Sequence, residues 1–384
     1  MSGLAVGMAI VLTAFSLKLW RRLQEFIALG RPGPTGAVLT STPFVSLIVP
    51  ARNEARVIEG CVRALLAQDY PAFEVIAVDD NSTDETPTIL ARIAAEDSRL
   101  RVVSAPPLPS GWMGKCHALW SGTQHARAKD EAGGWLLFVD ADTFALPGLV
   151  RGAVAYALAR RLVMLSPLPG QDLVSLAERV IQPVVFAMLQ LFLPPGRAND
   201  PNDRLGHVSG QCLAIRADVY FEIGGHSHPI VRNAISEDTA LGQVFKDARL
   251  PYEIVDGRLL VRTHMYTNFY EIWNGWAKNF FPGMRERGWL IPFAVFSSLV
   301  VIVYFSVVFF FPQPGWVWWL NAAMVGWLAV FLTGMRVVVG RFLDEPLTYV
   351  PTWPVGLIVV GGISLASWLR SVTRRGSVWK GRRY

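Results

Sequence analysis

The chain has 384 residues, of which 52% are apolar and 17% are charged, and its mean hydropathy is +0.33. Soluble domains average about 25% charged residues, so this composition excludes a disordered chain and makes membrane association the first expectation. The net charge is +6, and the last fifteen residues carry six basic and no acidic side chains. We interpret this tail as a membrane-surface anchor rather than a nucleic-acid-binding segment, because no basic patch recurs elsewhere in the sequence.

The first apolar stretch covers residues 4–17 and is followed by Lys18, Arg21 and Arg22. It has no basic residue before it and no small-residue cleavage site, which a secretory signal peptide would have. We therefore expect residues 1–20 to be a retained membrane anchor, with a cleaved signal peptide as the alternative. Because basic residues favour the cytoplasmic end of a membrane helix, the domain that follows is predicted to be cytoplasmic.

Residues 44–285 alternate between short apolar runs and amphipathic stretches. The runs at 46–50, 73–78, 100–103 and 135–139 predict strands, and residues 57–66 repeat apolar side chains with the period of a helix. This alternation predicts an α/β fold with a mostly parallel sheet flanked by helices. The sequence has no glycine-rich dinucleotide fingerprint and no P-loop.

Two acidic pairs come directly after predicted strands. They are Asp79 with Asp80, and Asp140 with Asp142. In open α/β sheets, ligands bind outside the carboxyl ends of the strands. Two carboxylates spaced like Asp140 and Asp142 suit a Mg2+ or Mn2+ ion that also binds substrate phosphates. The alternative is a solvated turn, because Asp is common in turns.

Two further motifs stand where helices are predicted to begin. Lys115 follows Gly111 and Gly114, and a lysine at such a position can contact a phosphate or a base. Glu237 and Asp238 follow a serine that is predicted to cap the helix. Acidic residues favour helix N-termini in any protein, so these two either stabilise the helix or supply a general base.

Aromatic and apolar segments follow the α/β pattern. Trp273, Trp276 and Lys278 lie on a predicted helix, where the tryptophans stack under a sugar or lipid or belong to a membrane-interface belt. An earlier apolar stretch at 180–193 is too short to span a bilayer, and it fits a buried helix as well as a membrane-surface helix.

The C-terminal block contains apolar stretches at 290–311, 316–335 and 353–369. The first two have the roughly 20 residues that a membrane span needs. Three full spans after a cytoplasmic domain would leave the basic tail outside the cell, against the positive-inside tendency. We therefore expect the third stretch to be re-entrant or interfacial. The predicted organisation is an anchor (1–20), an α/β domain (44–285), a membrane block (288–370) and a basic tail (371–384).

As a set, these motifs resemble family 2 glycosyltransferases with the GT-A fold. The matching segments, in chain order, are Val49-Pro-Ala-Arg-Asn-Glu54, Val78-Asp-Asp-Asn-Ser-Thr-Asp84, Gly114-Lys115, Asp140-Ala-Asp142 and Glu237-Asp238. Each segment alone is a weak signal, whereas their common order and spacing are specific. The resemblance covers residues 44–285.

The resemblance implies a role for each matching residue. The residues that would frame the base and ribose of a nucleotide sugar are Pro50, Arg52, Glu54, Asp79 and Asp80. Lys115 and Asp140 would contact the nucleotide, and Asp142, together with Asp140, would hold the divalent cation. Asp238, beside Glu237, would be the catalytic base of an inverting transfer.

The chain departs from one subgroup of this family. Membrane-bound polymer synthases and ceramide glucosyltransferases carry Q-x-x-R-W after the E-D motif, whereas residues 271–279 here read EIWNGWAKN. That segment and the closing WKGRRY are similar to bacterial enzymes that glycosylate carotenoids or hopanoid-type lipids. Trp273, Trp276 and Lys278 would then lie on the acceptor side.

We therefore predict a multi-pass enzyme of the cell membrane with a cytoplasmic catalytic domain. It would move one sugar from a nucleotide sugar, expected to be UDP-linked, to a lipid acceptor, with a divalent cation and no nucleic-acid partner. One alternative is a polyprenyl-phosphate, glycerolipid or sphingolipid acceptor. Another is a transporter subunit with a nucleotide-sugar-binding domain, although the predicted spans contain few ionisable residues.

Overall fold

The computed structural model describes residues 38–283, 315–373, 378–379 and 382–383, together with positions 17 and 21. The chain divides into two compact units. The α/β unit comprises Leu29–Asp172, Pro195–Met265 and Val378–Tyr384, and the helical unit comprises Met1–Ala28, Leu173–Pro194 and Tyr266–Ser377. The apolar stretch at 290–311 lies outside the described residues, as does the predicted anchor at 1–20 except for position 17.

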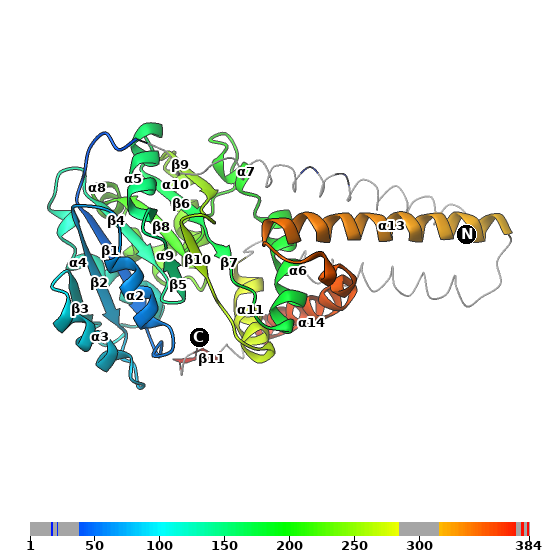
Figure 1. Ribbon diagram of the computed structural model, residues 1–384, viewed down its shortest axis with the longest axis horizontal. Coiled ribbons are helices and arrows are strands. Elements are labelled where there is room, and N and C mark those ends of the chain that lie inside the picture. Colours follow the sequence, from blue (N-terminus) through cyan, green and yellow to red (C-terminus); the bar gives the residue numbers. More distant parts are fainter. Residues whose placement is uncertain are drawn as a thin grey trace. The chain divides into compact units, whose positions relative to one another are not determined.

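A seven-stranded sheet forms the centre of the α/β unit, in the order β3-β2-β1-β4-β8-β6-β9 (Figure 1). Its strands are β1 (Val45–Ala51), β2 (Phe73–Asp79), β3 (Leu100–Ser104), β4 (Trp135–Val139), β6 (Met164–Leu168), β8 (Cys212–Arg216) and β9 (Tyr252–Asp256). β8 runs antiparallel to β4 and β6, and the other pairs are parallel. The predicted mostly parallel sheet is thus confirmed.

Helices cover both faces of this sheet because alternate strand residues point to opposite sides. In β1, Leu47 and Val49 join the core with α2 (Ile58–Leu66), α3 (Thr86–Glu96) and α5 (Leu149–Arg160). Ile48 joins the opposite core with α4 (Gly114–Gln124), α8 (Ala217–Glu222) and α10 (Glu237–Asp247). These strands are buried on both faces, which explains their nearly continuous apolar sequence.

Shorter elements complete the α/β unit. A small sheet has the order β5 (Thr143–Ala145), β10 (Val261–Thr263), β7 (Gly170–Gln171), and β11 (Val378–Trp379) pairs with β12 (Arg382–Arg383) in the basic tail. The short helices are η1 (Arg127–Lys129), α7 (Pro195–Asn199), η2 (Gly225–Ser227) and α9 (Pro229–Arg232). The hairpin in the tail was not predicted.

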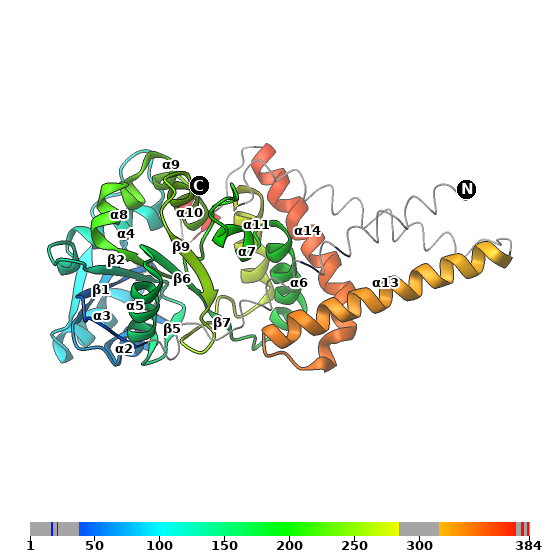
Figure 2. The ribbon, with the colours of Figure 1, turned by 90° about the horizontal axis from the view of Figure 1, so that it is seen from above.

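The helical unit contains α6 (Leu176–Phe192), α11 (Phe269–Gly283), α13 (Gly315–Phe342), η4 (Leu347–Thr352) and α14 (Trp353–Val372). Figure 2 shows α6, α11 and α14 side by side. Glycines of α14 allow this packing: Gly356 lies against the backbone of Val180 in α6, and Gly362 lies under the ring of Trp273 in α11. The predicted span at 316–335 lies within α13.

Among the residues that the structure describes, two stretches are long and apolar enough to cross a membrane by length and composition, at Leu176–Asn199 and Leu347–Val372. The second stretch falls in the predicted C-terminal block and contains residues 353–369, which were expected to be re-entrant or interfacial, whereas the first lies within residues 44–285, where no span was predicted. Residues 180–193 were predicted to be too short to span, but the capping box of Ser175 and Glu178 starts the helix earlier and α7 extends the apolar stretch. Two such helices are a weak indication of membrane association, so a multi-pass arrangement stays a prediction.

Candidate active site

The loops after β1 and β2 are bound to each other. Arg52 donates from Nη1 to the carbonyl oxygens of Asp80 and Asn81. The Asn53 backbone N–H donates to Ser82 Oγ over 3.0 Å, and Asn53 Oδ1 accepts from the Thr83 N–H at 2.8 Å. Asn53 has a φ of 53°, a left-handed conformation that Asn tolerates better than most residues. These bonds fix the two loops as one rigid rim at the carboxyl edge of the sheet.

The other predicted donor-side residues lie on the same rim. Pro50 pairs in register with Val78 near the ends of β1 and β2. The Glu54 N–H donates to Thr86 Oγ1 at 2.8 Å, which joins the first loop to the start of α3. Asp79 and Asp80 are 8% and 4% exposed, and Asp79 Oδ1 accepts from the Ser82 N–H. The structure therefore brings these predicted residues together.

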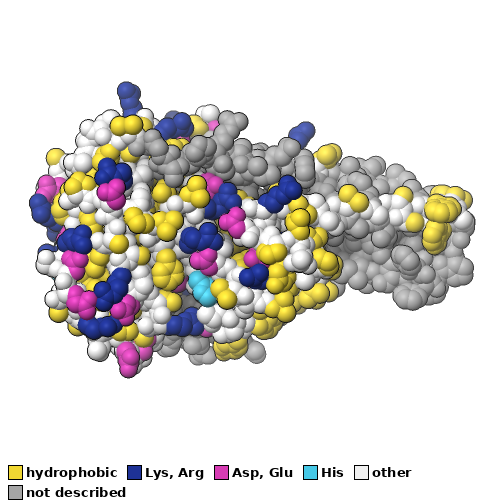
Figure 3. Space-filling view, viewed as in Figure 1, with side chains coloured by type: hydrophobic (Ala, Val, Ile, Leu, Met, Phe, Trp, Pro, Cys, Tyr) yellow, Lys and Arg dark blue, Asp and Glu magenta, His cyan; other side chains and the backbone are white. Residues whose placement is uncertain are grey.

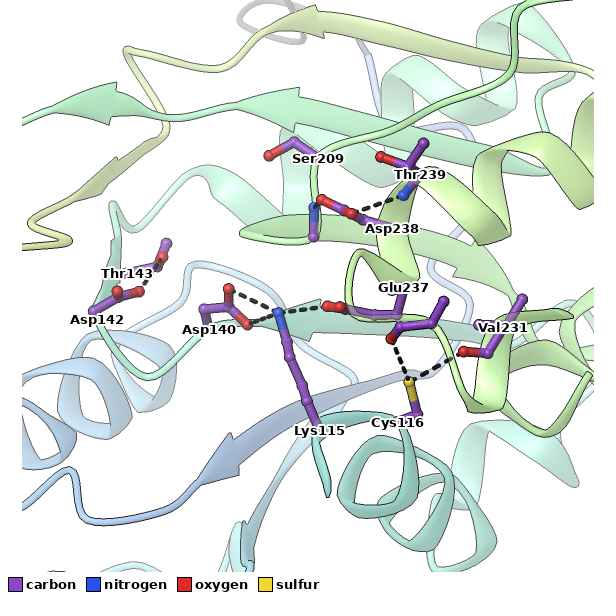
Figure 4. Close-up of polar contacts among 12 residues, drawn as sticks. Lys115, Cys116, Asp140, Asp142, Thr143, Ser209, Val231, Glu237, Asp238 and Thr239 are labelled. Atoms are coloured by element: carbon purple, nitrogen blue, oxygen red, sulfur yellow. Dashed lines mark hydrogen bonds and ion pairs between the residues drawn. The ribbon is translucent and has the colours of Figure 1, made fainter. Parts of the chain in front are cut away.

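Lys115 is the centre of the polar cluster in Figure 4. It lies in the first turn of α4, which begins at Gly114 as the sequence predicts. Its Nζ is 2.7 Å from Asp140 Oδ1 at the end of β4 and 2.7 Å from Glu237 Oε1 at the start of α10. One ammonium group thus bridges two acids that are 97 residues apart in sequence (237 − 140).

The charges of this bridge hold each other ionised. Burial opposes a charge on Lys115, but the carboxylates of Asp140 and Glu237 outweigh it and raise the lysine pKa well above its ordinary value. Burial likewise opposes the charge of Glu237, and the charge and hydrogen bond of Lys115 outweigh it, so the Glu237 pKa is lowered. A buried ion pair of this kind depends on all its partners, because removing one leaves an uncompensated charge.

Asp238 is held differently from its neighbour. Its Oδ2 accepts from the Gly210 N–H at 3.1 Å and its Oδ1 from the Thr239 N–H at 2.7 Å. Burial and then the negative charge of Glu237 raise the Asp238 pKa to about 6, although Lys115 and the two backbone N–H groups act in the opposite direction. Ser236 occupies the predicted N-cap position, but its side chain makes no capping hydrogen bond.

Asp142 lies two residues beyond Asp140, in the turn between β4 and β5 at the boundary between the two sheets. Its backbone carbonyl accepts from Thr263 Oγ1 and from the His264 N–H, each at 3.1 Å. Thr143 Oγ1 lies 3.4 Å from Asp142 Oδ1. In Figure 4 the Asp140 carboxylate points toward Lys115, whereas that of Asp142 lies beside Thr143. Within the described ranges, no group of three His, Cys, Asp or Glu side chains is arranged to hold a metal ion.

A comparison with protein families decides the identity of the α/β unit. Residues 46–224 match the model of glycosyl transferase family 2. This segment is a family 2 glycosyltransferase domain. Lys115, Asp140 and Asp142 lie within this matched segment, whereas Glu237 and Asp238 follow it, and the prediction of a family 2 glycosyltransferase domain is confirmed.

Relatives of known name agree with this family. The chain is 29% identical over 251 residues to the 4,4'-diaponeurosporenoate glycosyltransferase of Staphylococcus aureus strain USA300. That match covers 62% of this chain and 61% of the relative, so it spans less than two thirds of the relative's length. The protein of the same name from strain bovine RF122 is 26% identical over 371 residues, which is 88% of each chain.

A solved structure shows the same fold. The mannosyltransferase of Pyrobaculum calidifontis, in complex with GDP-Man and Mn2+, superposes with a TM-score of 0.55 at 18% sequence identity. The superposition covers 97% of this chain and 99% of that chain. The fold of the glycosyltransferase domain is therefore of the GT-A type, as predicted.

The predicted acceptor-side residues belong to the helical unit. Trp276 is 7% exposed, and its Nε1 donates to Gln182 Oε1 of α6 at 2.8 Å. Trp273 packs against Gly362 and lies 5.8 Å from the ring of Phe269, and Lys278 is half-buried. Trp276 thus has a packing role between α11 and α6. A role for these three residues toward an acceptor stays a prediction.

Sequence reasoning missed the glycines that bring α10 to the glycosyltransferase site. A Cβ on Gly210 would lie 3.2 Å from Asp238 Cβ and 3.3 Å from Glu237 Oε1. A Cβ on Gly242 would lie 2.5 Å from His207 Cα, and one on Gly206 would lie 2.6 Å from Gln243 Cα. These glycines stand in no motif that the sequence shows. Only the close packing between the 206–210 segment and α10 reveals their purpose.

Proposed function

We propose that the chain is an inverting glycosyltransferase that moves one sugar from a nucleotide sugar to a lipid acceptor. One observation carries the proposal. Lys115 joins Asp140, on the side where donor-binding loops lie, to Glu237, which stands beside the base candidate Asp238. A transfer with a charged leaving group needs a cation near that group and a base near the acceptor. Lys115, held by its two carboxylates, would supply the cation, and Asp238, whose pKa is raised, would supply the base.

The donor binds at the rim formed by the loops after β1 and β2. Asp79 and Asp80 have little exposure, and Arg52 donates to the carbonyl oxygen of Asp80, so that the rim would present carboxylate and backbone groups to a base and a ribose. Lys115 lies at the start of α4, where a helix N-terminus also favours a phosphate. We expect a UDP-linked sugar, with its diphosphate at Lys115.

Asp140 and Asp142 would hold a divalent cation with the donor. Mg2+ is commonly bound by one or two carboxylates, with phosphates and water completing its coordination. The two carboxylates after β4 fit this arrangement, since they are hard oxygen ligands within one turn and no third protein ligand is required. When bound, such a cation offsets the charge that develops on the departing diphosphate.

Asp238 would act as the base of the transfer. With a hydroxyl acceptor, the acceptor oxygen forms a bond to the anomeric carbon, the bond from that carbon to the diphosphate oxygen breaks, and Asp238 takes the hydroxyl proton; a carboxylate acceptor is already ionised and attacks without giving up a proton. The Gly210 and Thr239 N–H groups hold the carboxylate in a single orientation. A pKa of about 6 keeps Asp238 mostly ionised at neutral pH while making it a stronger base than an ordinary carboxylate.

An apolar acceptor agrees with the relatives and with the helical unit. The named relatives act on a carotenoid-derived acid, 4,4'-diaponeurosporenoate, as their name states. In this chain, α14 exposes Val355, Ile358, Leu365, Leu369 and Val372 along its length. Such a surface is suited to lipid contact, and a membrane site with a cytoplasmic catalytic domain would meet an acceptor that does not dissolve in water.

The test uses membranes that contain the full chain. We would add radiolabelled UDP-glucose, UDP-galactose, UDP-GlcNAc and GDP-mannose separately, with 4,4'-diaponeurosporenoate or a hydroxylated carotenoid as the acceptor. Label should enter the organic extract with one donor, require a divalent cation and disappear on addition of EDTA.

Matched controls make the assay specific. Membranes with Asp142→Asn should give no labelled lipid, whereas membranes with Asp172→Asn, a replacement on the surface of the same unit, should give as much as the natural protein. If all four donors left the organic phase unlabelled with either acceptor while the protein bound one of them, the proposed lipid transfer would be wrong.

A further inference from the structure

The two neighbouring acids of α10 have unequal environments. The side chain of Glu237 is 9% exposed and its Oε1 lies 2.7 Å from Lys115 Nζ. Asp238 is half-buried, and its partners are the backbone N–H groups of Gly210 and Thr239. The segment that matches the family model ends at residue 224 and reaches neither acid. The geometry distinguishes the two acids, because only one of them is tied to the lysine of the donor side.

Glu237 is badly placed to take a proton from an acceptor. Its lowered pKa, which Lys115 causes against the effect of burial, makes it a weak base. Gly210 also lies directly against it, with any Cβ at that position only 3.3 Å from Glu237 Oε1. A buried carboxylate that is paired and confined in this way can still act on its neighbours through its charge and its bond to Lys115.

We propose that Glu237 is a positioning residue, which holds Lys115 against Asp140 and sets the charge around Asp238, and that it is not itself the base. This role rests on the transfer proposed above, in which Asp238 is the base. Lys115 would then link the two halves of the site: its ammonium contacts the acid expected at the donor and the acid beside the base.

The titratable groups near Asp238 include Glu237, Lys115 and the thiol of Cys116, which burial keeps uncharged near pH 6 by raising its pKa well above its ordinary value. Glu237 approaches from the same helix, and Lys115 approaches from α4 with the opposite charge. The 206–210 segment contributes the Gly210 backbone. His226 in η2 is near enough to Glu237 for an electrostatic interaction and is neutral near pH 6, because burial lowers its pKa to about 4. Its Nδ1 lies 2.9 Å from the Tyr220 hydroxyl.

The test is the titration of Asp238 in the full chain without donor. Carbon-13 NMR of protein labelled at the aspartate carboxyl carbons would follow the signal that is missing in Asp238→Asn. In the natural protein this carboxyl should titrate near pH 6. Glu237→Gln removes the charge but keeps the shape, so the Asp238 pKa should fall by about one pH unit.

Two further variants separate the effect of the Glu237 charge on the Asp238 pKa from other effects of substitution. Glu237→Asp keeps the negative charge but shortens the side chain, so the Asp238 pKa should stay near 6 or rise. Glu222→Gln makes the same chemical change at an exposed position of α8 and should leave the titration unchanged. An unchanged Asp238 titration in Glu237→Gln would overturn the proposal. If Glu237→Gln failed to fold, Glu237→Asp would decide, and a fall of the Asp238 pKa in Glu237→Asp would overturn the proposal.

The transfer assay then checks the consequence for catalysis. In Glu237→Gln, the acidic limb of the kcat profile should move to lower pH by the same amount and kcat at pH 8 should fall about threefold, as expected for a weaker base. A Glu237→Gln enzyme as inactive as Asp238→Asn would show that Glu237 takes the proton and would contradict its positioning role. If no donor gave transfer with the natural protein, the proposed function would fail, whereas the NMR titration would still decide whether Glu237 controls Asp238.

Discussion

At the scale of single residues, the protonation of Asp238 should control the rate. Burial and the charge of Glu237 raise its pKa to about 6, and a base works only when ionised. Transfer should therefore rise with pH through about 6 and level off above it, since the proton is bound below the pKa. The measurement is kcat between pH 4.5 and 8 with a hydroxyl acceptor at saturating donor. A profile that stays flat down to pH 5 would exclude Asp238 as the base.

Gly210 should be required for the orientation of Asp238. Replacing it with alanine puts a Cβ 3.2 Å from Asp238 Cβ and 3.3 Å from Glu237 Oε1, so the loop and the carboxylates must move apart. We expect Gly210→Ala to lower kcat by tenfold or more, in line with the about 100-fold cost of a 1 Å displacement at a reacting centre, while the fold is kept.

The control for this variant is Gly148→Ala. A Cβ at position 148 would lie 3.6 Å from Leu260 Cδ2, which is an ordinary contact, so kcat should not change. Steady-state kinetics and circular dichroism of both variants would test the claim. Natural activity in Gly210→Ala would mean that the close packing of residue 210 against Asp238 does not set the orientation of this carboxylate.

The sequence predicted most of the candidate residues but not the residues that they contact. Asp79, Asp80, Asp140 and Asp142 end apolar strands, and the carboxyl ends of parallel strands meet at one edge of a sheet. The pairing of Lys115 with Glu237 depends instead on where α4 and α10 pack on the sheet. No local sequence pattern indicates where these two helices pack. The sequence therefore predicted a role for each residue but did not predict their contact.

At the scale of elements, the position of α10 depends on glycines in close contact. Gly242 faces His207, and a Cβ would lie 2.5 Å from His207 Cα, which is backbone and has little freedom to yield. Gly242→Ala should therefore lower the free energy of unfolding by about 1–3 kcal/mol and reduce transfer together with it. Chemical denaturation is the measurement. A variant of unchanged stability would show that the approach of α10 is adjustable.

Prediction of strands succeeded only where the apolar run was strong. The runs that predicted β1 to β4 are long and continuous, because these strands are buried on both faces. β6 contains Pro167 and pairs in part with β8, which is antiparallel to its neighbours. Such strands are defined by pairing with distant segments rather than by their own composition, so the sequence did not reveal them.

At the scale of the whole chain, the α/β unit and the helical unit differ in their surfaces. On the face seen in Figure 3, basic and acidic side chains lie beside one another over the α/β unit. Ion pairs of this unit include Arg63 with Glu59 and Arg160 with Glu253. Exposed pairs of this kind contribute little to stability and keep a surface soluble. The helical unit has instead the apolar face of α14. This division suits an enzyme that joins a water-soluble donor to a lipid.

The most direct test of the account is to separate donor binding from transfer with Asp238→Asn. The donor identified in membranes would be titrated into the natural protein and the variant by calorimetry, and label transfer to lipid would be measured with the same samples. We predict that donor affinity stays within about threefold of the natural value, whereas transfer to a hydroxyl acceptor falls by at least 100-fold. Transfer at the natural rate by Asp238→Asn would contradict the account, because the cluster around Lys115 would then lack its base.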